Sequence, residues 1–170
     1  MEKKQTHIMY GFLTALAMII VNIVLYIAGL AFEPWAQWVS YIPFVIGIVM
    51  NAMAFSKAND EYVTFGNVFS SGFKASSIIA LTMLVWSFIF MMIFPEMKDK
   101  AMEMTRERMA HQQVSDEQAD QAIEMTKKYF TVFMVAGVIF GTLFFGAIFS
   151  LVGAAIAKKK GDSRPPQVLQ

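Results

Sequence analysis

The stretch from Tyr129 to Ala157 reads YFTVFMVAGVIFGTLFFGAIFSLVGAAIA and contains no Asp, Glu, Lys, Arg or His. Three other stretches, Ile8–Ala31, Trp38–Phe55 and Ala75–Phe94, also lack all five of these residue types. A helix needs about 20 apolar residues to cross the roughly 30 Å hydrocarbon core of a bilayer. The sequence therefore predicts an all-α membrane protein, a four-helix transmembrane bundle.

The last stretch is longer than a membrane span requires, and the first could be mistaken for a signal peptide. The last one has 29 residues, and a helix of that length measures about 43 Å, so we expect it to tilt or protrude. The first one follows a basic start, Lys3 and Lys4, as in a secretory signal. Its apolar run is longer than the roughly 7–15 residues of a signal peptide, so we expect an uncleaved first span.

Composition limits the classes of function. Of the 170 residues, 56% are hydrophobic, and the net charge of +1 gives no reason to expect nucleic acid as a partner. The chain has no cysteine, which excludes disulfides, thiol catalysis, iron–sulfur clusters and cysteine-based zinc sites. We predict one transmembrane domain over residues 1–160, followed by a disordered tail over residues 161–170.

A polar stretch, Glu96–Lys128, separates the third and fourth spans. Pro95 ends the third span, because proline lacks a backbone N–H. Ser115 and Gln118 match a capping box, which predicts that the second of two helices starts at Asp116. The result is an extramembrane helical hairpin. Its eight acidic and six basic residues favour a solvated, ion-paired surface over a pair of catalytic carboxylates.

An aromatic motif precedes the third span. It consists of Phe65, Gly66, Phe69, Gly72 and Phe73. Its phenylalanines recur every four residues and would form one stripe on a helix, for which Thr64 is a suitable N-cap. Lys57 and Lys74 flank the motif, and anionic headgroups would attract them. We predict an interfacial helix that turns into the third span and either anchors at the membrane surface or offers a groove to a partner.

Basic residues favour one orientation. Four spans place both termini on one side, together with the second connection. That side holds eight Lys or Arg residues against six on the other. Lys3 and Lys4 precede the first span, and no basic residue follows it until Lys57. The positive-inside rule therefore predicts both termini in the cytoplasm.

Small and polar residues give the spans faces for close packing, which helices in lipid need in order to associate. The predicted packing positions are Gly11, Asn22, Gly47, Asn51, Gly137, Gly141, Gly146, Ser150 and Gly153. The last span has two such faces on nearly opposite sides, one a GxxxG formed by Gly137 and Gly141 and the other running from Gly146 to Gly153. Both faces could contact neighbouring spans, or one could bind a partner.

Asn22 and Asn51 are the most polar side chains within the predicted spans. A buried amide needs a hydrogen-bond partner. Each amide is therefore interpreted either as an interhelical hydrogen bond or as the lining of a solute path. The absence of acidic, basic and histidine side chains from the spans argues against a proton or ion relay.

No catalytic or metal site emerges from the sequence. The two histidines, His7 and His111, lie far apart in the chain, and the fourteen methionines form no tight cluster. Thioethers suit Cu(I), but adaptable apolar packing explains these methionines more simply. No Ser-His-Asp set, phosphate loop or HExxH motif is present. We expect no cofactor, no metal and no enzymatic activity.

The order of these features resembles a bacterial family of four-span inner-membrane proteins, domain of unknown function 4199, found mainly in Bacteroidota. The resemblance covers roughly Tyr10–Ala157. It rests on Tyr10-Gly11 opening the first span, on Phe65-Gly66-x-x-Phe69-x-x-Gly72-Phe73, and on Pro95 followed by a hairpin whose second arm Ser115 caps. It implies a four-span fold and a Gram-negative envelope, and it supplies no catalytic residues.

These observations predict a non-enzymatic accessory or scaffold subunit of an envelope membrane complex. Its partners would be the lipid bilayer and another membrane protein or a second copy of itself. The alternative is a small oligomeric transporter or channel for a neutral solute, with Asn22 and Asn51 lining its path. A third hypothesis is an enzyme that acts on lipid or glycan through the hairpin carboxylates.

Overall fold

The computed structural model describes residues 3–111 and 115–161, and the regular structure in that part of the chain is helical. The helices are α1 (His7–Ile27), α2 (Ala36–Ala58), α3 (Phe65–Ile93), α4 (Glu96–His111) and α5 (Asp116–Ile156). All except α4 are long and apolar enough to cross a membrane, which confirms the four predicted spans. Except for Gly161, the predicted disordered tail lies outside the described residues.

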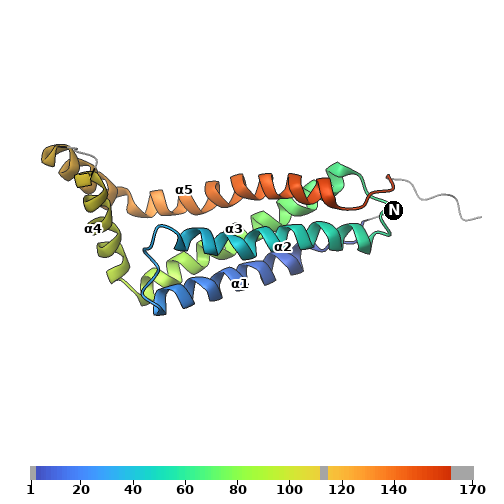
Figure 1. Ribbon diagram of the computed structural model, residues 1–170, viewed down its shortest axis with the longest axis horizontal. Coiled ribbons are helices and arrows are strands. Elements are labelled where there is room, and N and C mark those ends of the chain that lie inside the picture. The colour runs from blue at the N-terminus through green and yellow to red at the C-terminus, as the bar shows by residue number, and fades with distance from the viewer. Residues whose placement is uncertain (1–2, 112–114, 162–170) are drawn as a thin grey trace, which may run out of the picture.

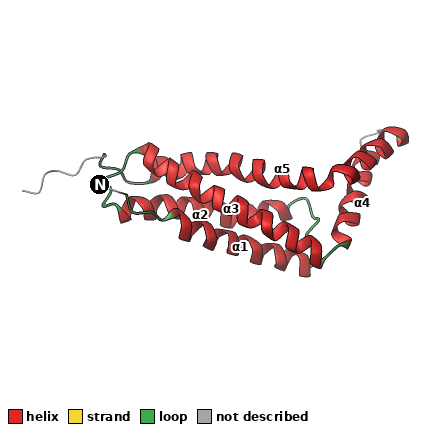
Figure 2. Cartoon of the chain, turned by 180° about the vertical axis from the view of Figure 1, so that it is seen from behind, coloured by secondary structure: helices red, strands yellow, loops and turns green. Residues whose placement is uncertain are grey.

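The four apolar helices run alongside one another as an elongated bundle, and α4 stands at an angle at one end (Figures 1 and 2). α3 packs against α1, α2 and α5, and α2 also packs against α1 and α5. Two groups of buried apolar side chains fill the bundle. One is Ala15, Met18, Phe44, Ile48, Ala75 and Ile79, and the other is Ala52, Phe55, Val63, Val68, Ala154 and Ala157.

α1 ends four residues before the predicted limit of its span. Gly29 has a φ of +73°, a left-handed conformation that glycine adopts without a Cβ clash. The Leu30 N–H donates to the Leu25 carbonyl and the Gly29 N–H donates to the Tyr26 carbonyl. These two bonds form a Schellman motif, which satisfies the last carbonyls of the helix.

The predicted interfacial helix at Phe65–Phe73 is wrong, because α3 runs without a break from Phe65 to Ile93. Thr64 is the N-cap, as predicted, and forms a capping box with Asn67. No proline lies between residues 65 and 93, so no missing N–H interrupts the helix there. The phenylalanine stripe is mostly exposed, and the buried face of this part of α3 carries Val68, Ser71 and Gly72.

The predicted hairpin consists of α4 and the first turns of α5. The Ser115 hydroxyl accepts a hydrogen bond from the Gln118 N–H, as an N-cap does. The second arm then continues into the fourth apolar helix across a kink at Tyr129, where φ is −106° and ψ is 16°. The 41 residues of α5 therefore form two helical segments joined at this kink, the first in the hairpin and the second in the bundle.

Five glycines mark the closest helix crossings. A Cβ added at Gly47 would lie 1.9 Å from Oγ1 of Thr14, and one added at Gly146 would lie 2.3 Å from Oγ of Ser76. Gly11, Gly72 and Gly153 also meet a neighbouring helix at less than 3.0 Å by the same measure. Close backbone approach of this kind is how small residues hold membrane helices together.

Candidate functional site

The two ends of the bundle differ in how they are closed. At the end that carries the N-terminus, hydrogen bonds join Lys4, the α2–α3 connection and the residues that directly follow α5. The Lys4 N–H donates to Oδ1 of Asn59 at 2.8 Å, and Nδ2 of Asn59 donates back to the Lys4 carbonyl at 3.1 Å. The Ser56 hydroxyl donates to the Lys158 carbonyl. We call this region the closed end.

An ion pair adds to the closed end. Lys160 Nζ lies 2.9 Å from Oε2 of Glu61, and the Lys160 N–H donates to the Glu61 carbonyl at 2.6 Å. The hydrogen bond from Lys160 and its charge lower the pKa of the Glu61 carboxyl, and the same contact raises the pKa of Lys160. Both side chains are partly exposed, so salt screens the pair.

Asn51 lies deeper at the same end and is fully buried. Its Oδ1 accepts from the Thr6 hydroxyl at 2.7 Å, and its Nδ2 donates to the Ser71 hydroxyl at 3.2 Å. Asn51 therefore joins the residues preceding α1 to α2 and α3. Ser150, on α5, is also buried, but its hydroxyl has no hydrogen-bond partner among the described residues and packs against Gly72.

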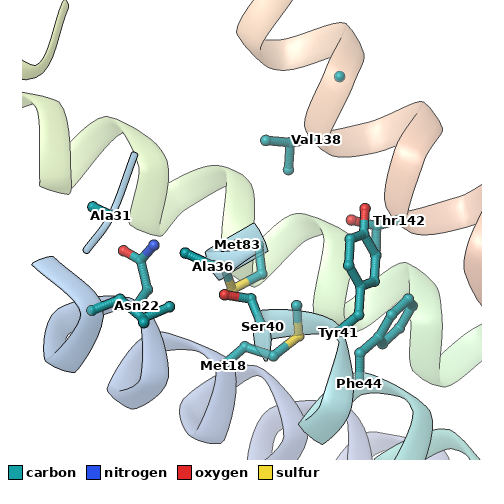
Figure 3. Close-up of a pocket in the computed structure, with 12 residues that line it drawn as sticks. Met18, Asn22, Ala31, Ala36, Ser40, Tyr41, Phe44, Met83, Val138 and Thr142 are labelled. Carbon is teal, nitrogen blue, oxygen red and sulfur yellow. The ribbon is translucent and has the colours of Figure 1, made fainter. Parts of the chain in front are cut away.

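At the opposite end α5 leaves the other helices, and a cavity of about 380 Å³ lies between them (Figure 3). Its lining consists of Met18, Asn22, Leu25, Ala31, Ala36, Ser40, Tyr41, Phe44, Met83, Gly137, Val138 and Thr142. This volume falls within the range of small-molecule sites, which combine an apolar lining with a few polar groups. We call this region the open end.

Four side chains give the cavity its polar groups. The Asn22 Oδ1 accepts from the Trp86 indole N–H at 3.2 Å, which leaves the Asn22 amide N–H₂ without an acceptor among the described residues. The hydroxyls of Ser40, Tyr41 and Thr142 likewise have no hydrogen-bond partner within residues 3–111 and 115–161. The lining contains no carboxylate, ammonium, guanidinium or imidazole group.

Aromatic packing separates the cavity from the closed end. The rings of Tyr41 and Phe145 lie 5.0 Å apart, and those of Phe44 and Phe149 lie 5.6 Å apart, edge to face. Phe44 and Ile48 are fully buried. Within this chain, therefore, packed side chains lie between the Asn22 cavity and Asn51, and the two amides line no common path.

Gly137 and Gly141 lie beside the cavity on α5. A Cβ added at either position would meet no described side chain or neighbouring helix within 4 Å. Gly137 lines the cavity and Gly141 does not. Gly146, Ser150 and Gly153, the other predicted packing face of α5, contact α2 or α3 closely. Only one of the two small faces of α5 is thus used within the chain.

The outer rim of the open end ties α1 to the hairpin. The Tyr26 hydroxyl donates to Oε1 of Glu96 at 2.9 Å, and the Tyr26 ring packs against Phe90 and Phe94. Hydrogen bonds from the Glu96 backbone N–H and from the Tyr26 hydroxyl lower the pKa of the Glu96 carboxyl. The first residue of α4 is thereby fixed next to the last turn of α1.

The hairpin carries charge on its surface. Arg106 pairs with Asp120, and both side chains are about two-thirds exposed. The hairpin carboxylates whose side chains are described are all exposed, namely Glu96, Asp99, Glu103, Glu107, Glu117, Asp120 and Glu124. Among the described residues, no three His, Cys, Asp or Glu side chains lie close enough to hold a metal ion.

Sequence reasoning singled out Asn22 and Gly137 as packing positions, but it did not predict that they would share a cavity with Ser40, Tyr41 and Thr142. Hydroxyls in apolar helices are common, and nothing in their spacing separates these three from others. They matter because α5 diverges from α2 at this end, and that angle depends on packing elsewhere in the bundle. The exposed GxxxG was the one sequence signal that pointed to this region.

The comparisons with known proteins identify a family and assign no activity. The sequence matches a family described as "Protein of unknown function (DUF4199)" over residues 9–159. No curated protein and no solved structure matched the chain. The match covers most of the chain, and the chain belongs to the DUF4199 family.

Proposed function

We propose that this chain is a non-enzymatic accessory subunit of a membrane complex in a bacterial envelope, and that its open end receives the partner. The partner is another membrane protein or a second copy of the chain. The single observation that carries the proposal is the contrast between glycines. Five meet a neighbouring helix within the chain, whereas Gly137 and Gly141 meet none. A GxxxG face that no helix covers is suited to close contact with a helix from outside.

The hairpin extends the same end of the molecule. It projects past the bundle in Figures 1 and 2, and α4 packs mainly against α5. Its exposed acids and bases give a polar surface outside the apolar helices. A partner that contacts α5 within the bilayer would therefore meet the hairpin beyond it.

The proposed orientation places the closed end in the cytoplasm and the hairpin outside the inner membrane. The closed end gathers Lys3, Lys4, Lys57 and Lys158–Lys160. Such clustering next to apolar helices favours the cytoplasmic side. Cysteine labelling with a membrane-impermeant maleimide tests this, because Glu117→Cys should react in intact spheroplasts and Lys57→Cys only after lysis.

Affinity capture from mild detergent, followed by mass spectrometry, tests the accessory role. Gly141→Leu should reduce recovery of the partner, and Gly137→Leu should reduce it similarly. Ala155→Leu is the matched control, since Ala155 is an exposed small residue on α5 near the closed end. A monomer that captures neither a second copy nor another membrane protein would count against the proposal.

The cavity favours one alternative, a small oligomeric transporter or channel for a neutral solute. Its polar groups lie at membrane depth, but in the single chain Phe44 and Ile48 separate it from the closed end. Transport would therefore require a path completed by other copies. Flux of uncharged solutes into proteoliposomes, compared with empty vesicles, tests this role, and equal rates would remove it.

A further inference from the structure

The cavity at the open end has features that the accessory role does not use. An amide N–H₂ and three hydroxyls face or border it without a partner among the described residues, while the remaining lining is mostly apolar. In hydrocarbon an unpaired polar group is costly. A site of this composition is stabilised by a molecule that offers a hydrogen-bond acceptor and an apolar chain.

We propose that the cavity binds one chain of a neutral lipid together with the ester or alcohol group that adjoins the chain. The Asn22 N–H₂ donates to the ligand oxygen, and the hydroxyls of Ser40, Tyr41 and Thr142 provide further polar positions along the cavity. Met18, Met83 and Val138 contact the chain. Methionine side chains adapt well to a flexible apolar ligand.

The charge of the lining selects the ligand class. A fatty-acid carboxylate or a phosphate would enter a cavity that has no cationic side chain to pair with it, and burial of an unpaired charge is far more costly than burial of an ester. The volume of about 380 Å³ lies near the lower end of the range for ligand sites. It therefore suits a single chain rather than a complete two-chain phospholipid.

The location of the cavity agrees with a lipid source. Ala31, in the α1–α2 connection, and Ala36, the first residue of α2, line the cavity. Trp35 and Trp38, whose aromatic rings are typical of a membrane interface, lie next to Ala36 in the sequence or within one turn of it. Ester groups of lipids occupy the same depth. The exposed side of α5 at Gly137 gives a chain lateral access from the bilayer.

Photocrosslinking of the full-length protein in liposomes tests the site. The probe is a monoacylglycerol with a diazirine in its acyl chain, and labelled peptides are mapped by mass spectrometry. Labelling should concentrate on the segments of α1, α2, α3 and α5 that line the cavity, and unlabelled monooleoylglycerol should compete. A diazirine fatty acid at neutral pH should label these segments much less.

Two glycine variants provide a matched pair. Gly137→Leu places a side chain in the cavity where an added Cβ meets no atom within 4 Å, so folding should persist while labelling falls about tenfold or more. Gly141→Leu lies one turn away and outside the lining, and should leave labelling unchanged. Asn22→Leu should reduce competition by monooleoylglycerol without preventing folding, as checked by circular dichroism.

Three results would overturn the proposal. The first is labelling spread evenly along the whole length of the apolar helices. The second is labelling that Gly137→Leu does not change. The third is a folded protein that is not labelled, because only water occupies the cavity. The accessory role is tested independently of lipid binding. Partner capture is expected to depend on both Gly137 and Gly141, whereas lipid labelling is expected to depend on Gly137 alone.

Discussion

The closed and open ends of this bundle are built from the same four helices, yet they are held together differently. At the closed end, polar side chains and backbone groups join Lys4 and the residues that directly follow α5 to the α2–α3 connection, and Gly153 lets α5 approach α2. At the open end, α5 leaves its neighbours, and a cavity is bordered by hydroxyls that have no hydrogen-bond partner among the described residues. From this comparison we propose that one end stabilises the fold and the other binds a partner or ligand.

The largest expected effect comes from filling a close helix crossing. Gly47→Ala places a Cβ 1.9 Å from Oγ1 of Thr14, so helices α1 and α2 must separate at a cost of about 3 kcal/mol. The same substitution at Gly137 meets no neighbour and should leave stability unchanged or slightly higher, because alanine favours helix. Unfolding in mixed micelles with increasing SDS measures the stability of both variants. Equal destabilisation by Gly47→Ala and Gly137→Ala would contradict the proposed difference between the two ends.

A smaller difference should separate the two asparagines. Asn51→Leu removes a buried amide that joins Thr6 and Ser71, and leaves both hydroxyls without that partner, at a cost of about 1–2 kcal/mol. Asn22→Leu removes a single bond with Trp86, worth about 0.6 kcal/mol in typical membrane proteins. The same unfolding assay compares the stabilities of the two variants. A larger loss of stability for Asn22→Leu than for Asn51→Leu would mean that the open end, not the closed end, stabilises the fold.

Acid should loosen the closed end without opening the bundle. Because its partner Lys160 lowers the folded-state pKa of Glu61, this contact stabilises the fold above the unfolded pKa. That stabilisation is lost as the pH falls through the lowered folded value. The protection of the Lys160 amide, measured as its exchange rate relative to the intrinsic rate at the same pH, should therefore fall at acidic pH. In Glu61→Gln this protection should already be low at neutral pH and should change little with pH.

The smallest effect is expected in the hairpin. Arg106→Ala breaks the ion pair with Asp120, but both side chains are mostly exposed, and such pairs contribute between nothing measurable and about 1 kcal/mol. A double-mutant cycle with Asp120→Ala measures the coupling, which should decrease further in high salt. A coupling above 2 kcal/mol would mean that the hairpin, too, is a stability element.

The sequence predicted the spans and several helix boundaries because those depend on local chemistry. Runs without charge predicted four apolar helices, and Thr64 and Ser115 cap helices as expected. The prediction of a separate interfacial helix was wrong. Phenylalanines that recur every four residues share one face of a helix, but this spacing does not mark where a helix ends. α1 ends early because Gly29 adopts a left-handed conformation. The apolar sequence continues past Gly29, so hydrophobicity alone did not predict this helix end.

The candidate site was less predictable, for a physical reason. Asn22 and Gly137 were singled out as packing positions, but their association with Ser40, Tyr41 and Thr142 depends on the angle between α5 and α2. That angle results from many contacts near Gly146 and Ser150. Local sequence patterns predict which residues share a face of one helix. A cavity between helices can be predicted only when the positions of the helices relative to one another are known.

The length of α5 has a mechanical consequence. α5 holds the hairpin arm at its start, the cavity wall at its middle and the tight crossing with α3 near its end. About 13 residues, roughly 20 Å of helix, separate Gly137 from the crossing at Ser150. A pivot of 5° about that crossing would displace the cavity wall by roughly 2 Å. Because the kink at Tyr129 lies between the hairpin arm and Gly137, a force on the hairpin would change the width of the cavity only to the extent that the kink transmits it.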